Sequence, residues 1–307
     1  MRDAFVNSVC NLAQTDKDLI LVSGDLGFGV LCKFWDAYPS QFINAGVSEQ
    51  NMASVAAGMA LEGKKVFIYS IGNFPTLRCL EQIRNDICYH NTSVIIVSVG
   101  AGFAYGSQGM SHHATEDIAI MRALPGLTIF SPCDSQETAA AVNTAYEMCS
   151  PCYIKLGKGG EPDLHVKEIN DCYKAHMLIG GKDTAILATG AIVKEAVDAS
   201  ILLKAKNVNC AVYSFPMIKP MNEAIINELA LRYKFLFTLE EGNILGGFGS
   251  AVSELVSFCQ NRKAIVIRLG IKDSFTSEVG SQEYLRAFNE ISAMYIEKEI
   301  SWRIANE

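Results

Sequence analysis

The sequence lacks the features that would assign it to a membrane, a nucleic acid or an export pathway. Its longest apolar stretch, around residues 94–104, is shorter than the roughly 20 residues that a membrane-spanning helix needs. Residues 1–5 do not begin the apolar core of a signal peptide. Lys and Arg number 26 against 33 Asp and Glu, whereas nucleic-acid binders usually carry a basic field. We therefore expect a cytoplasmic protein that binds neither membrane nor nucleic acid.

Charged residues are also few, at 19%, while half of the residues are apolar. A disordered chain has the opposite balance, with low hydrophobicity and high net charge. The 307 residues are enough for about two domains, at roughly 100–200 residues each. A chain of this length buries a large core without disulfides or structural metals.

The ten cysteines are expected to be reduced thiols, because the chain shows no export signal. Cys149 and Cys152 have the spacing of a thioredoxin-like pair, but they follow a predicted helix and precede a predicted strand. A reactive pair sits at a helix N-terminus instead, where the dipole lowers the pKa of a thiol. Ordinary buried thiols are the better interpretation. Since no further ligands lie near this pair and no HExxH or HxH pattern occurs, we expect no metal ligands in this chain.

Short apolar runs alternate with helical patterns along the whole chain. Runs of this kind are typical of strands that helices cover on both faces, as in parallel sheets. The pattern predicts strands at 19–23, 65–69, 94–98, 127–130, 153–156, 184–188, 209–213, 235–239 and 264–268. It predicts helices from residue 49 and at 136–148, 192–205 and 249–259. The fold class is therefore α/β, with mainly parallel sheets flanked by helices.

A change in composition divides the chain into two parts. Glycines and a proline at 157–162 follow a predicted strand, and a polar segment runs from there to about residue 180. The alternation of strands and helices then begins again. We predict a first domain at 1–160, a linker at 161–180 and a second domain at 181–307.

Several candidate functional residues have ordinary interpretations when each is taken alone. Glu49 begins an amphipathic helix, where an acid complements the helix dipole. His112 and His113 lie in a polar loop, and Phe74 follows a strand, where it would be core. No lysine-containing phosphate loop occurs, and the glycines at 100–102 lack the third glycine and the helix of a dinucleotide fingerprint.

The order and spacing of these residues are more specific than any one of them. The blocks are, in chain order, Asp25-Leu26, 46–51 (GVSEQN), 74–84, 109–113 (GMSHH), 115–119, 240–252, 268–275 and Gly280. Together they cover nearly the whole chain. The series resembles the C-terminal half of transketolase and of deoxyxylulose-phosphate synthase.

The resemblance implies a thiamine-diphosphate-dependent enzyme that transfers a two-carbon ketol unit between sugars. The first domain then corresponds to the pyrimidine-binding domain and the second to the transketolase C-terminal domain. The family's diphosphate motif, Gly-Asp-Gly, does not occur here. The chain therefore resembles one subunit of a split transketolase, in a heterotetramer with an N-terminal subunit. That partner would carry the motif and hold most of the Mg²⁺ or Ca²⁺.

The resemblance also assigns roles to residues of the cofactor site. Glu49 corresponds to the carboxyl that bonds N1′ of the pyrimidine and promotes loss of the C2 proton. Phe74 corresponds to the aromatic ring that stacks on the pyrimidine. His112 corresponds to a histidine that contacts the donor sugar and helps to move protons. Asp25, Leu26 and Ile71 match other positions near the cofactor, with Ile71 in place of an aromatic residue.

The substrate-binding set is only partly kept. Arg2 matches a phosphate-binding arginine, and Lys158 stands where another arginine is usual, which keeps the charge but loses the bidentate fork. Gln108 replaces an acid that contacts a donor hydroxyl, and His113 is placed in the same set. Gly100 and Gly29 stand where a histidine and a serine are usual. These changes predict a modified or nucleotide-linked sugar, and the alternative is an ordinary transketolase that contacts phosphate differently.

Three other functions remain open at this stage. The chain could be the beta subunit of a 2-oxo acid dehydrogenase-type enzyme, against which the blocks around His112 and Glu240 argue. It could be a deoxyxylulose-phosphate synthase-like enzyme. It could also be a non-catalytic structural subunit, against which the intact Glu49 and Phe74 argue.

Overall fold

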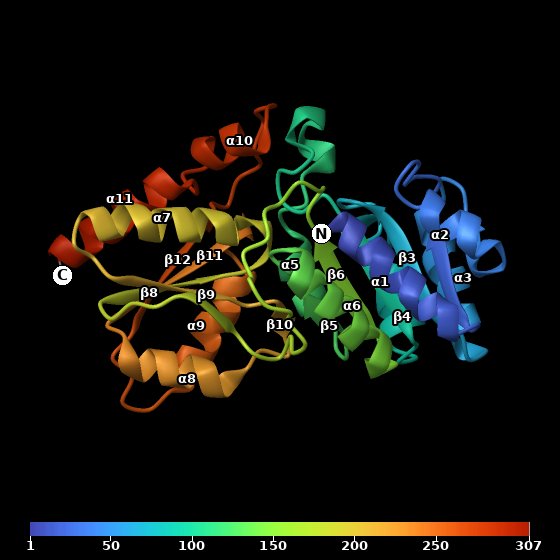
Figure 1. The fold of residues 1–307 in the computed structure, drawn as a ribbon, viewed down its shortest axis with the longest axis horizontal. Coiled ribbons are helices and arrows are strands. Elements are labelled where there is room, and N and C mark those ends of the chain that lie inside the picture. The colour runs from blue at the N-terminus through green and yellow to red at the C-terminus, as the bar shows by residue number, and fades with distance from the viewer. Residues whose placement is uncertain (307) are drawn as a thin grey trace.

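The computed structural model describes residues 1–306, which form two sheets with helices on both faces (Figure 1). The strands are β1 Leu19–Ser23, β2 Phe42–Asn44, β3 Lys65–Ile71, β4 Val94–Val99, β5 Thr128–Phe130, β6 Cys152–Leu156, β7 His176–Ile179, β8 Thr184–Ala188, β9 Cys210–Ser214, β10 Met217–Lys219, β11 Phe235–Asn243 and β12 Ile265–Ile271. The helices are α1 Arg2–Thr15, α2 Cys32–Ala37, α3 Glu49–Leu61, α4 Leu80–Gln82, α5 Asp117–Arg122, α6 Ser135–Met148, α7 Val193–Ala205, α8 Glu223–Arg232, α9 Phe248–Phe258, α10 Gln282–Phe288 and α11 Ala293–Asn306. The α/β fold class is confirmed.

The first sheet has seven strands in the order β10-β5-β6-β4-β3-β1-β2. All of its pairs are parallel except β10 with β5. Strand β10 comes from the second half of the chain, so the second half contributes an edge strand to the first sheet. The sequence pattern does not predict this strand, because three residues are too few to show a period.

The second sheet has five strands in the order β12-β11-β8-β9-β7, and only β7 runs antiparallel to its neighbour. Strand β7 lies inside the segment 161–180 that is predicted as a linker. The second sheet therefore begins before residue 181, and only the first part of that segment is irregular.

Alternate residues of the strands face different cores, as the two-residue period of a strand requires. Leu19 and Leu21 of β1 pack with α1 and α6, whereas Ile20 and Val22 pack on the side of α3. The same holds in the second sheet, where α7 and α11 cover one face and α8 and α9 the other (Figure 1). The core on the α3 side continues into the α8 and α9 side of the second sheet. The two halves therefore share apolar packing.

The cysteine pair shows one departure from the expected buried thiols. Cys152 is buried in β6, and burial raises the pKa of its thiol to about 12. Cys149, by contrast, is exposed at the end of α6, with a left-handed φ of 48°. Both are free cysteines. The expectation was therefore wrong for Cys149, because the chain turns there between helix and strand and leaves the side chain in solvent.

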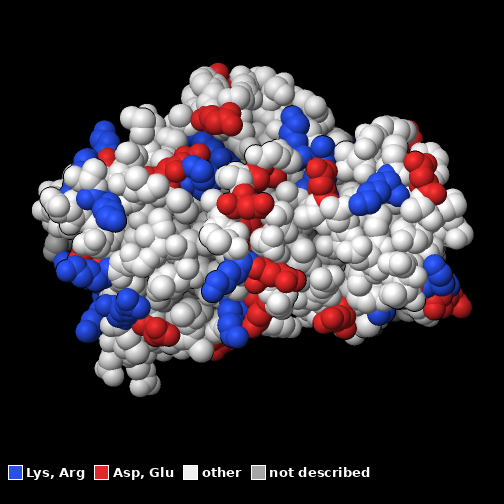
Figure 2. All heavy atoms as spheres, viewed as in Figure 1, with Lys and Arg blue, Asp and Glu red and all other residues white. Residues whose placement is uncertain are grey.

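Charges of both signs are interspersed over the face drawn in Figure 2, with wide areas of uncharged residues between them. Within residues 1–306, no helix combines the length and apolar character that would carry it across a bilayer.

Candidate active site

The predicted site residues gather at one edge of the first sheet. Strands β1, β3, β4 and β6 are parallel, so the segments that follow them leave the sheet at the same edge. Asp25 follows β1, Ile71 ends β3 with Phe74 three residues later, and Lys158 follows β6. Glu49 begins α3, which follows the edge strand β2. In open α/β sheets, ligands bind at the carboxyl ends of the strands.

Glu49 is a buried acid with one strong partner. It is the first residue of α3, and its side chain is only 4% exposed. Nη1 of Arg78 donates to both carboxylate oxygens, at 3.0 Å each. Ionised carboxylates have about four acceptor positions in total. Glu49 therefore keeps capacity to accept or share a further proton.

Arg78, Phe74 and His112 pack together beside this carboxylate. The guanidinium carbon of Arg78 lies 4.2 Å from the centroid of the Phe74 ring. On another side of Phe74, the His112 ring lies edge-on at 5.3 Å between centroids. Ser111 Oγ and His112 Nδ1 are 3.0 Å apart, in hydrogen-bond contact. The structure thus brings three predicted residues, Glu49, Phe74 and His112, into one group linked through Arg78.

Arg78 is a site residue that sequence reasoning missed. It lies within the motif block 74–84, but nothing in its spacing predicts a contact with Glu49, 29 positions earlier. The only available signal was a basic residue shortly after the aromatic Phe74. Because its side chain is about half exposed, the guanidinium can leave the ring without breaking a buried contact.

A second group of residues is basic and surrounds Tyr105. The Lys158 ammonium lies 5.1 Å from the centroid of the Tyr105 ring. The Arg2 guanidinium lies beside the Tyr105 hydroxyl, and burial raises the pKa of that hydroxyl despite the positive charge. The His112 ring lies 6.5 Å from the Tyr105 ring, so Tyr105 connects the two groups. Tyr105 also was not predicted.

Tyr105 explains the glycine at position 100. A Cβ built on Gly100 would lie 2.3 Å from a carbon of the Tyr105 ring, and Gly100 has a φ of +101°. Any side chain there would clash with the ring and strain the backbone. The tyrosine ring therefore occupies space into which a side chain at position 100 would extend.

The two adjacent histidines differ strongly. His113 is buried, with its ring edge-on to Phe103 at 5.0 Å, and burial lowers its pKa. Its Nε2 has no hydrogen-bond partner among the described residues. His112 is only partly buried and faces Phe74. The ordinary interpretation of two loop histidines in solvent is thus wrong for His113, because the loop folds back against the sheet.

The remaining predicted residues lie at the outer part of the same edge. Asp25 is exposed, has a φ of 57° and accepts a hydrogen bond from Asn44 Nδ2 at 2.9 Å. Leu26 and Ile71 are half-buried. Gln108 is exposed and closes a short turn through its backbone, which bonds Tyr105.

The second half of the chain holds the loop that carries His112. Glu241 at the end of β11 accepts a hydrogen bond from the Phe103 amide at 2.9 Å and pairs with Arg286 at 2.6 Å. A Cβ on Gly102 would lie 2.4 Å from Glu241 Cγ, so only glycine allows this close approach. The Glu240 carboxylate instead accepts bonds from the amides of Phe248 and Gly249 at the start of α9. These two acids are therefore structural, and Glu241 positions the loop.

These features define a class: a two-part α/β protein with a buried acid, an aromatic ring and a basic group at the carboxyl edge of one sheet. The model of the transketolase pyrimidine-binding domain matches residues 1–160, and that of the transketolase C-terminal domain matches residues 173–292. The chain belongs to the transketolase family, whose enzymes use thiamine diphosphate.

Two relatives and one solved structure illustrate the similarity. One of the two chains of the apulose-4-phosphate transketolase of Phocaeicola vulgatus is 34% identical over 259 residues, which are 83% of each chain. A chain of the 6-deoxy-6-sulfo-D-fructose transketolase of a Clostridium species is 32% identical over 93% of this chain and 88% of the relative. A structure described as a split-gene transketolase in an inactive beta4 tetramer has a TM-score of 0.87 and 32% identity. It covers 98% of this chain and 96% of the other.

Proposed function

We propose that this chain is the pyrimidine-binding subunit of a two-chain, thiamine-diphosphate-dependent transketolase. The observation that supports this most is the buried Glu49 carboxylate, which lies in one group with the Phe74 ring and His112 at the edge of the sheet. An acid, a stacking ring and a partly exposed histidine are the groups that this chemistry needs from the pyrimidine side. In this proposal residues 1–160 form the pyrimidine-binding domain and 181–307 the C-terminal domain.

The residues present fit the pyrimidine end of the cofactor. One face of the Phe74 ring is covered only by the guanidinium of Arg78, a planar group that also bonds Glu49. A planar aminopyrimidine makes the same two kinds of contact, stacking on an aromatic ring and a hydrogen bond to a carboxyl. Arg78 therefore occupies the place that the pyrimidine ring would take, and its half-exposed side chain allows it to move aside.

Each polar residue then has a definite task. Glu49 holds and shares a proton at N1′ of the pyrimidine, and its burial favours this exchange because water does not compete for the proton. His112 contacts the donor sugar and moves a proton at the hydroxyl next to the carbon–carbon bond. Thiamine diphosphate, when bound, supplies the electron sink for breaking and forming that bond. Asp25, Leu26 and Ile71 complete the walls of the cofactor site.

The partner subunit supplies what this chain lacks. Since the Gly-Asp-Gly diphosphate motif is absent from the sequence, we assign the diphosphate and its Mg²⁺ or Ca²⁺ to an N-terminal subunit. Similarity to a split-gene transketolase supports a two-chain enzyme. We propose a heterotetramer with two copies of each chain, in the cytoplasm.

Phe74→Ala should weaken cofactor binding in the reconstituted enzyme by about 1–3 kcal/mol, the value of burying an aromatic side chain. That corresponds to an increase of about 5–150-fold in the cofactor Kd. Calorimetric titration with thiamine diphosphate and Mg²⁺ measures it. Phe258→Ala, which changes an exposed phenylalanine at the end of α9, is the matched control. Equal affinity in the two variants would remove Phe74 from the site.

Arg78→Ala should tighten cofactor binding by about two- to fivefold, because the guanidinium competes for the Phe74 face with about 0.5–1 kcal/mol. The same titration measures it. Arg84→Ala, which changes another arginine of the segment that follows Phe74, serves as the control. Weaker binding by the Arg78 variant would mean that Arg78 contacts the cofactor and is not a competitor.

We further propose that the sugar is a modified one. The basic group at Arg2 and Lys158 is suited to an anionic sugar, but Tyr105 closes the space beside Gly100. Lys158 presents a point charge where an arginine would present a fork. The two relatives named above are described as transketolases for apulose-4-phosphate and 6-deoxy-6-sulfo-D-fructose, both unlike ordinary pentose phosphates. This similarity supports a donor or acceptor of the same kind, with nucleotide-linked sugars also within the class.

Steady-state kinetics with the reconstituted enzyme test this proposal. We expect kcat/KM for xylulose 5-phosphate with ribose 5-phosphate to stay below the range of efficient enzymes, about 10⁴ M⁻¹s⁻¹. Apulose 4-phosphate and 6-deoxy-6-sulfofructose, tested as donors in parallel, should include a better substrate. A value above that limit for the pentose phosphates would identify a conventional transketolase.

A further inference from the structure

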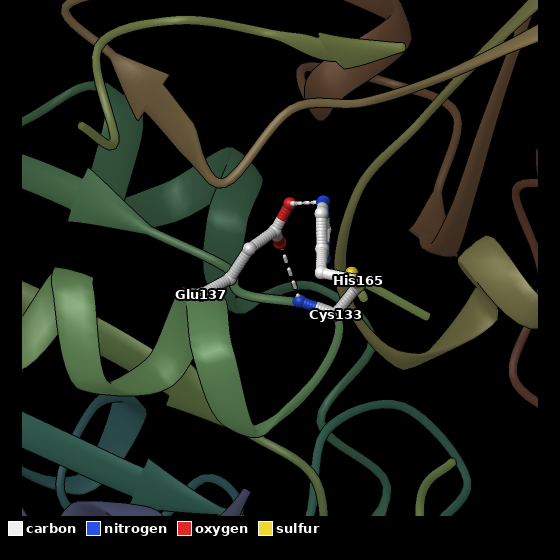
Figure 3. Close-up of side chains that lie close together, drawn as sticks. All are labelled: Cys133, Glu137 and His165. Atoms are coloured by element: carbon white, nitrogen blue, oxygen red, sulfur yellow. Dashed lines mark hydrogen bonds and ion pairs between the residues drawn. The ribbon is translucent and has the colours of Figure 1, made fainter. Parts of the chain in front are cut away.

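A thiol, a carboxylate and an imidazole lie together at the N-terminal end of α6 (Figure 3). Cys133 precedes the helix, Glu137 is in its first turn, and His165 comes from the segment between the two sheets. One ligand atom from each lies within 4.8 Å of the other two. The proposed transketolase function uses none of these residues.

The group has two buried polar atoms without partners. Glu137 Oε1 and His165 Nε2 make no hydrogen bond within the described part of the chain, although the carboxyl is fully buried and the imidazole is 7% exposed. They face each other at 3.6 Å (Figure 3). The other carboxylate oxygen of Glu137 accepts a bond from the Cys133 amide at 2.8 Å. Buried polar atoms without partners are rare in native proteins and call for an explanation.

Asp134 holds the imidazole in place. Its Oδ2 accepts bonds from the amides of Leu164 and His165 and contacts His165 Nδ1 at 2.8 Å. These bonds lower the pKa of Asp134 to about 2, so the carboxylate can only accept and Nδ1 must donate. The Nε2 atom therefore points toward Glu137 and Cys133. A carboxylate on the far nitrogen of a histidine is the usual support of a metal-bound imidazole.

We propose that Cys133, Glu137 and His165 bind a zinc ion. Thiolate, imidazole and carboxylate together are typical zinc ligands. Bonds of about 2.0–2.3 Å place neighbouring ligand atoms of a tetrahedral site about 3.3–3.8 Å apart, the range of the observed 3.6 Å contact. A thiolate and a carboxylate balance the charge of the ion. Binding replaces the protons on the thiol and on Nε2, which pass to solvent.

The fourth ligand is a water molecule or the hydroxyl of Ser214. Ser214 ends β9, and its buried Oγ makes no well-formed hydrogen bond in the described structure. It lies beside both the Cys133 thiol and the Glu137 carboxyl. His176 is not a ligand, because its Nε2 already contacts the Asp171 carbonyl at 3.0 Å.

The ion would join the segment between the sheets to the first sheet's helix α6. The segment is already attached there by Asp163 to Ser135 and by the Asp134 bonds. Without metal, the same residues form a buried Asp134–His165–Glu137 charge cluster. The two states differ in their metal content and spectra.

The test is titration of the chelator-treated full chain with Co²⁺, followed by displacement with Zn²⁺. We expect one equivalent to bind with a thiolate-to-cobalt charge-transfer band. Zinc-edge X-ray absorption of the native chain should show one sulfur at about 2.3 Å with nitrogen and oxygen ligands. The absence of stoichiometric binding, or coordination with no sulfur or several, would overturn the proposal.

Variants locate the site. Cys133→Ser should abolish the charge-transfer band, and His165→Gln should lower metal affinity at least about tenfold. Cys152→Ser is the matched control, since Cys152 is an equally buried thiol in β6 outside the cluster. If Cys133→Ser does not fold, the native sulfur count and the His165 variant still decide. Full binding by the His165 variant would overturn the proposal.

Discussion

Glu49→Gln in the reconstituted two-chain enzyme should fold normally and lose about 10²–10⁴-fold in kcat, the usual contribution of a positioned proton-transfer group. The swap is isosteric, and a glutamine carbonyl can still accept one bond from Arg78, so the start of α3 keeps its contacts. A neutral amide, however, cannot share a proton with N1′. Ketol transfer in the steady state measures the loss.

Glu62→Gln is the matched control for this experiment, because Glu62 is an exposed acid at the other end of the same helix. It should leave kcat unchanged. Both variants are first compared with the parent protein by circular dichroism and cofactor titration, which separates a chemical loss from a binding loss. Ketol transfer by the Glu49 variant at the parent rate would exclude Glu49 from the chemistry.

The isolated chain should bind thiamine diphosphate weakly, with a Kd well above about 1 µM, and should show no ketol transfer. Stacking on Phe74 and one hydrogen bond to Glu49 are its contribution, and Arg78 competes for both contacts. The diphosphate, which carries most of the charge of the cofactor, needs a metal and donors that we assign to the partner. Calorimetry on the isolated chain is the measurement. Sub-micromolar binding without a partner would contradict the division of the site between two chains.

The sheets could be predicted because buried parallel strands are continuous apolar runs. The predicted strands at 94–98 and 184–188 correspond closely to β4 and β8. Strand β10 could not be predicted, since it has three residues and pairs with a strand of the other half of the chain. Its place in the first sheet depends on a tertiary contact that no local pattern contains.

The site shows the same division. Glu49, Phe74 and His112 were found because their motif blocks resemble those of a known family, and their order along parallel strands brings them together. Arg78 and Tyr105 were missed because their roles come from contacts with residues 29 and 7 positions away, on other segments. His165 lies in a polar segment, where nothing in the sequence predicts that Asp134 orients its ring toward Cys133 and Glu137.

The central claim is that the cofactor is activated only where this chain meets its partner. Hydrogen–deuterium exchange at C2 of thiamine diphosphate tests it most directly, measured by NMR with this chain alone, the partner alone, and both chains together. We predict accelerated exchange in the mixture and the rate of free cofactor in each single chain. Fast exchange with either chain alone, or no acceleration in the mixture, would contradict the account.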